Sequence, residues 1–210
     1  MGLCISCTIP SALANIGQTK KHGGYGEIAR FYFQRMRTAG VDNAITVATD
    51  DPTEVATWNA LNALTTSAKV VAGPLVGAGF TIPNSEDATV EQPGGIMEIV
   101  RKNPVMAEGV FQAMSQATIL KVKALECEPQ AADGLGFFAV TACGNILAAT
   151  DDAGLTIEPI PVRYLSVSSL SFGAGTELTK NAFKMQLDGN WSDRIIEIAP
   201  ADFDALSWKL

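Results

Sequence analysis

NPVMAEGVFQAMSQATILKVKALECEPQAADGLGFFAVTACGN, residues 103–145, is the stretch that decides the predicted fold. Asn103-Pro104 indicates a helix start, because Asn caps free N–H groups and Pro at the first helical position loses no hydrogen bond. Pro129 and Gly134 indicate its end. Between them, apolar residues recur at three- and four-residue steps. They are Ala107, Val110, Phe111, Met114, Ala117, Thr118, Val122 and Leu125. We therefore expect one main helix over about 104–126.

Strands surround this expected helix. Residues 137–140 and 146–147 are strand-like runs joined by a Gly144-Asn145 turn, which predicts a hairpin. Residues 27–37 alternate between two faces and are rich in aromatic side chains, as strands are. A helix with one apolar stripe must bury that stripe against another element, and here a sheet is the available partner. The sequence thus predicts an α+β fold, mainly β, with antiparallel hairpins.

Two further elements complete the predicted fold. Asp50-Asp51-Pro52 indicates the start of a short second helix over about 52–65. The stretch 69–92 is β-branched, punctuated by Gly and Pro, and nearly free of charge before Glu86, which predicts a long hairpin. So much uncharged surface suggests contact with another subunit. The candidate subunit-interface residues are Val70, Val71, Leu75, Val76, Phe80 and Ile82.

The bulk properties predict one domain. Residues 1–26 contain several glycines and little periodicity, so we expect an extended N-terminal arm followed by a single domain over 27–210. No run approaches the roughly 20 apolar residues that span a bilayer, and the N-terminus lacks a secretory signal. We therefore expect a soluble protein that is made in a cytoplasm and has no membrane partner. The net charge of −7 argues against a dedicated nucleic-acid-binding protein.

The sequence carries no recognisable catalytic or cofactor site. His22 is the one histidine, and it lies in a glycine-rich stretch, while the acidic pairs occur at turns and helix starts. No nucleotide-binding, hydrolase or metalloprotease motif occurs in a fitting context. We predict no enzyme activity, no cofactor and no metal site. Cys4 and Cys7 form a CxxC pair that suits half a zinc site, a redox pair or simply reduced thiols, and reduced thiols are favoured because no second close pair occurs.

Several later segments resemble virion structural proteins of tailed phages, particularly phages of Bacteroidota-type bacteria. The segments are residues 136–140 with 144–147, 165–173, and 190–193 with 200–204. The resemblance implies a tail-tube or tail-ring protein, a β-sandwich or barrel with one flanking helix and a long hairpin that reaches a neighbouring subunit. It also implies hexameric rings stacked around a channel for DNA, contacts with adjacent tail and neck proteins, and a place in the virion tail.

Other functions stay open at this level. A neck protein, a capsid decoration or a head protein would share most of these features. A non-viral β-rich module could bind carbohydrate or nucleic acid, because residues 27–37 combine basic and aromatic side chains.

Overall fold

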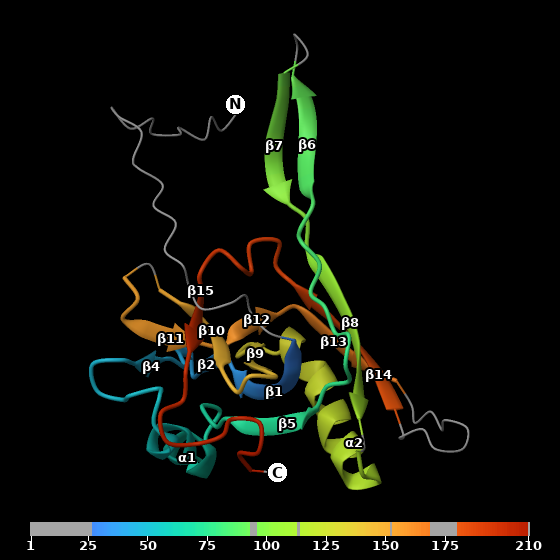
Figure 1. Ribbon diagram of the computed structural model, residues 1–210. Coiled ribbons are helices and arrows are strands. Elements are labelled where there is room, and N and C mark those ends of the chain that lie inside the picture. The colour runs from blue at the N-terminus through green and yellow to red at the C-terminus, as the bar shows by residue number, and fades with distance from the viewer. Residues whose placement is uncertain (1–26, 93–95, 113, 152, 169–179, 210) are drawn as a thin grey trace.

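The computed structural model describes residues 27–92, 96–112, 114–151, 153–168 and 180–209. These residues form two packed antiparallel sheets, two α-helices and a hairpin that stands out from the body (Figure 1). The predicted N-terminal arm, residues 1–26, lies outside the described residues. The predicted fold class, α+β and mainly β with antiparallel strands, is confirmed.

Among the described residues, the larger sheet has eight strands, and β1 is the last but one on its main path. Its main path runs through β4 (Ile45–Thr46), β11 (Thr156–Glu158), β10 (Ile146–Thr150), β9 (Leu135–Thr141), β1 (Ile28–Arg35) and β5 (Val71–Leu75). Two more strands extend it, β12 (Ile160–Val162) on β9 and β15 (Ile195–Ile198) on β10. The smaller sheet contains β13 (Tyr164–Val167), β14 (Lys180–Leu187) and β8 (Val105–Gln112). Thus β5 forms one edge of the larger sheet.

The remaining elements are short or peripheral. A small ribbon pairs β2 (Arg37–Thr38) with β3 (Val41–Asp42), and the protruding hairpin pairs β6 (Asp87–Gln92) with β7 (Ile96–Lys102). The helices are α1 (Val55–Ala63), α2 (Gln116–Ala124) and the 3₁₀ helix η1 (Leu125–Gln130).

β1 is buried on both of its faces, so it connects two hydrophobic cores. Phe31 and Phe33 point into the core between the two sheets, and Tyr32 points into the core on the far side of the larger sheet. The Phe31 ring packs edge-on against four other phenylalanine rings, with centroids 5.2 to 6.3 Å away. Each such contact contributes about 0.5–1.5 kcal/mol beyond simple burial. The rings are those of Phe80, Phe111, Phe137 and Phe183.

Helix α1 and the C-terminal residues 199–209 cover the far side of the larger sheet. Trp58 is fully buried there, and Trp208 packs against it with ring centroids 6.3 Å apart. The Arg30 side chain, only 2% exposed, holds this layer in place. Its Nη1 donates to the carbonyl oxygens of Leu206, at 2.8 Å, and Trp208, at 2.6 Å. Its Nε donates to the Gly73 carbonyl oxygen at 2.9 Å, so one guanidinium joins β1, β5 and the C-terminal segment.

The expected main helix over 104–126 is wrong in its first half. Residues 105–112 form β8 instead, which pairs with β14 along its whole length, from Leu187 opposite Val105 to Lys180 opposite Gln112. Helix α2 begins only after Ser115, whose Oγ accepts a hydrogen bond from the Thr118 N–H. The short helix expected over 52–65 is confirmed as α1.

The expected hairpin over 69–92 is also wrong, because that stretch serves three different elements. Its first part is β5, which pairs with β1. Its middle part makes isolated bridges to β8, at Val76 with Phe111 and at Thr81 with Glu108, and so crosses between the two sheets. Its last part is β6, which pairs with β7. The long hairpin therefore spans residues 87–102.

The Arg30 contacts predict the outcome of one substitution. Arg30→Met should lower the free energy of unfolding by roughly 3 kcal/mol or more, because buried carbonyl groups that lose their donor cost about 1–3 kcal/mol each. Arg37→Met is the matched control, since that exposed side chain makes only a surface ion pair with Asp42. Chemical denaturation measures both. Equal stability of the two variants would contradict the role given to Arg30.

The buried face of α2 predicts a second contrast. Ile119 and Leu120 are neighbours in the same helix, yet Ile119 is 3% exposed and Leu120 is 61% exposed. Ile119→Asp should lower stability by about 4 kcal/mol or more, since it buries an unpaired charge. Leu120→Asp should leave the thermal melting curve nearly unchanged. A comparable loss in both variants would show that α2 packs by a different face.

Candidate assembly surfaces

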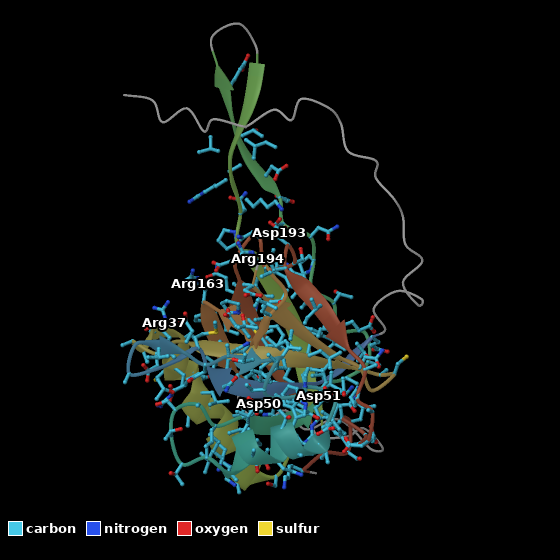
Figure 2. The ribbon with its side chains drawn as sticks, turned by 90° about the vertical axis from the view of Figure 1, so that its left-hand side faces the viewer. Arg37, Asp50, Asp51, Arg163, Asp193 and Arg194 are labelled. Atoms are coloured by element: carbon cyan, nitrogen blue, oxygen red, sulfur yellow. The ribbon has the colours of Figure 1, made fainter. Side chains whose placement is uncertain are left out.

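The hairpin of β6 and β7, called the arm from here on, extends away from the two sheets (Figures 1 and 2). Its strands pair with each other from Asp87 opposite Lys102 to Gln92 opposite Ile96. At its base, the Asn103 N–H donates to the Glu86 carbonyl oxygen at 2.8 Å, and Lys102 Nζ lies 3.1 Å from Asp193 Oδ1. No other described strand pairs with β6 or β7, so the body holds the arm at its base.

The arm exposes apolar side chains to solvent. Ile99 and Val100 are each 56% exposed, and the register of the two strands shifts at this point. An isolated two-stranded ribbon is at best marginally stable in water, because neither of its faces is covered. Exposed apolar surface of this kind is typical of sites that contact another chain. The arm is therefore the first candidate assembly surface.

The six candidate interface residues from the sequence lie in two different environments. Val70, Val76 and Phe80 are buried within this chain, with 0%, 7% and 5% of their surface exposed. Ile82 is half-buried and packs against the core between the sheets. Val71 and Leu75, both on β5, are 45% and 37% exposed. Only these last two present substantial apolar surface to solvent.

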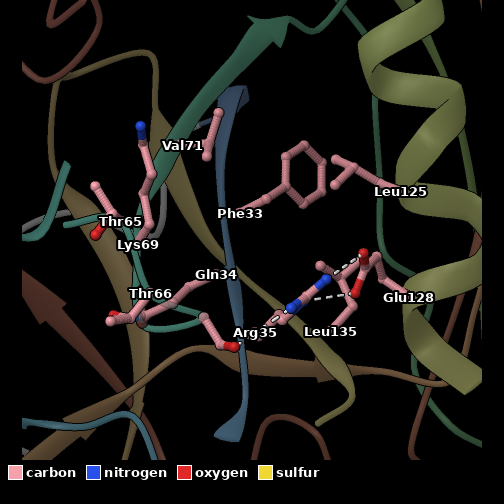
Figure 3. A pocket seen from close by; sticks show the side chains of 11 residues that line it. Phe33, Gln34, Arg35, Thr65, Thr66, Lys69, Val71, Leu125, Glu128 and Leu135 are labelled. Atoms are coloured by element: carbon pink, nitrogen blue, oxygen red, sulfur yellow. Dashed lines mark hydrogen bonds and ion pairs between the residues drawn. The ribbon is translucent and has the colours of Figure 1, made fainter. Parts of the chain in front are cut away.

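Val71 and Leu75 border a groove between the edge strand β5 and the helical segment α2–η1. It consists of two adjoining pockets of about 450 and 590 Å³, which share Phe33, Val71 and Leu125 in their walls. We call it the β5 groove and define its apolar wall by Phe33, Val71, Leu75, Val122 and Leu125. Figure 3 shows the first pocket, with the Phe33 ring facing the Leu125 side chain.

Basic side chains surround this apolar wall. Arg35 forms a two-point ion pair with Glu128, with both N–O distances at 2.7 Å (Figure 3). Lys69 lines the first pocket, and Lys121 and Lys209 line the second. These three lysines are exposed, and none forms an ion pair with any residue that the structure describes. The groove therefore offers apolar surface bordered by uncompensated positive charge.

A third pocket, of about 360 Å³, collects carboxyl groups near the base of the arm. Burial, and then the nearby charges of Asp42 and Asp151, raise the pKa of Glu158. The other two acids in this pocket are in ion pairs, Asp188 with Arg163 at 2.8 Å and Asp193 with Lys102 at 3.1 Å. Figure 2 shows Arg163, Asp193 and Arg194 in this region, below the arm. Surface ion pairs of this kind contribute little to stability, about 0–1 kcal/mol each.

The described part of the chain holds no group of three or more His, Cys, Asp or Glu side chains placed to bind a metal ion. Cys127 and Cys143 are exposed free thiols. Cys4, Cys7 and His22 lie outside the described residues.

In the part of the chain that the structure describes, no helix has both the length and the apolar content needed to cross a membrane. Comparison with protein-family models, curated proteins and solved structures gave no significant match to the chain. The function is therefore inferred from the arm and the β5 groove.

Proposed function

We propose that this protein is a structural subunit that self-assembles into the rings or tube of a phage tail, around a channel through which DNA passes. The observation that carries the proposal is the arm. It is an uncovered two-stranded ribbon with Ile99 and Val100 each 56% exposed. Such a ribbon gains stability when a second chain covers it. The segment resemblance to virion structural proteins supplies the kind of particle, and hexameric rings are the expected form.

The charge of the chain is compatible with a DNA channel. A net charge of −7 on each copy would give an assembled ring a strongly negative field. DNA passes such a surface without adhering to it, because both carry negative charge. In this proposal the ring contacts further copies of itself and the neighbouring tail and neck proteins, and DNA is a passing cargo.

A different virion component, such as a neck ring, a capsid decoration or a head protein, is the second candidate, since an arm of this kind would serve there as well. A binding module that stacks bases on residues 27–37 is disfavoured. Phe31, Tyr32 and Phe33 are at most 2% exposed, and Arg30 is equally buried, so these side chains are not available to a ligand.

Removal of the arm tests the proposal. Replacing residues 88–101 by Asn-Gly would join Asp87 to Lys102, which are already paired, through a two-residue hairpin turn. The body should keep its melting temperature, because both cores lie outside the arm. The full chain should sediment as rings or tubes visible by negative-stain electron microscopy, and the shortened chain as a monomer.

The outcome that contradicts the proposal concerns the full chain alone. A full chain that stays monomeric at high concentration, in low and in high salt, with no rings in the images, would exclude a self-assembling subunit. Rings formed equally well by the shortened chain would show that the arm is not required for assembly.

A further inference from the structure

We infer that the arm of one copy docks by its β6 strand into the β5 groove of the next copy. This inference rests on the proposed self-assembly and names the two surfaces that meet. It follows from four properties of these surfaces, which are their open strand edges, their opposite charges, their exposed apolar side chains and their positions at opposite ends of the molecule.

Both surfaces have an open strand edge. β5 is the last strand on its side of the larger sheet, and β6 pairs only with β7 among the described strands. Apart from its ladder with β1, the described hydrogen bond to Val71–Leu75 is that of Arg30 to the Gly73 carbonyl oxygen. A strand edge presents unpaired N–H and C=O groups, and one edge can add to another to extend a sheet. β6 and β5 can therefore pair across two chains.

The charges of the two surfaces are complementary. Glu86, Asp87 and Glu91 are exposed along β6 and its base, and none forms an ion pair with a described residue. The β5 groove carries the unpaired Lys69, Lys121 and Lys209. Two copies of a chain with net charge −7 repel each other overall, so a stable contact requires a local match of this kind.

The apolar groups also match. Ile99 and Val100 on the arm are each 56% exposed, and the wall of the groove offers Val71 and Leu75, which are 45% and 37% exposed in the single chain. A contact between these side chains would remove apolar surface from water on both copies.

The positions of the two surfaces determine the kind of assembly. The arm leaves one end of the molecule, and β5 and α2 lie at the opposite end (Figures 1 and 2). An arm therefore cannot reach the groove of its own chain, and the contact joins the arm end of one copy to the groove end of another. The contact is head to tail, and such contacts continue from copy to copy. In the proposed tail this contact joins each copy to the next.

The first test compares two neighbouring lysines in the last turn of α2. Lys121 lines the groove and Lys123 does not, yet both lie at the same helix end. Lys121→Glu should raise the apparent dissociation constant of the assembly at least about tenfold, because it places like charges at a contact. Lys123→Glu should assemble as the parent chain does. Sedimentation velocity measures both, and unchanged melting curves establish that both variants fold.

The second test is a charge exchange. Lys69→Glu/Lys121→Glu should abolish assembly, and adding Asp87→Lys/Glu91→Lys in the same chain should restore it. Lost assembly without restoration would overturn the assignment of β6 as the partner. Equal losses of assembly in the Lys121→Glu and Lys123→Glu variants would contradict docking at the β5 groove.

These outcomes separate the inference from the proposed function. Assembly that withstands Lys69→Glu/Lys121→Glu would overturn the docking inference and leave the self-assembling subunit in place. A parent chain that never assembles would overturn the proposed function itself, and the docking inference with it.

Discussion

The burial of β1 on both faces is the constraint on which the rest of the structure depends. Its phenylalanines fill the core between the sheets, and Tyr32 fills the core beneath α1 and the C-terminal segment. Arg30 also lies within this second core, where a charged side chain is tolerated only with full hydrogen bonding. The C-terminal carbonyls supply that bonding, and so the last residues of the chain are required to complete the environment of a residue near its beginning.

The composition of the two cores explains why the arm is separate from the body. The apolar residues that build the two cores come from the sheets, α1, α2 and the C-terminal segment, and no arm residue whose burial is described belongs to either core. The arm can thus change its environment without disturbing the body. Its strands are held together by their own ladder and by contacts at the base, including Lys102 with Asp193. An element with so few supporting contacts is the part of a molecule best suited to take its final support from a neighbour.

The sequence predicted the fold class and many strands, but it misplaced two elements for identifiable reasons. Ala107 and Phe111 fit both a two-residue and a four-residue repeat, so the pattern alone could not separate strand from helix. The pairing with β14, far away in the chain, decided in favour of the strand. Pro93-Gly94-Gly95 is a turn signal between two β-branched runs, and it could have located the arm. The groove was beyond sequence reasoning, because it joins β5 to a helix whose start was misplaced.

For a related reason, the sequence pattern could not distinguish the buried candidate interface residues from the exposed ones. Val70 and Val71 are adjacent and chemically identical, yet one is buried and the other is 45% exposed. Which of two neighbours faces the core depends on the register of β5 against β1, where Val71 lies opposite Phe33. Hydrophobicity alone carries no information about that register.

In the proposed assembly, the lysines around the β5 groove would make the contact between acidic chains selective. Negative charge spread over the surface keeps single copies apart at most orientations. An apolar groove without charges would accept many partners, whereas a groove ringed by lysines rejects any strand that does not bring acids to the same positions. Ion pairs formed there are shielded by salt, while the apolar contacts beneath them are not. Charge would therefore select the orientation of the contact, and burial of the apolar wall would hold it.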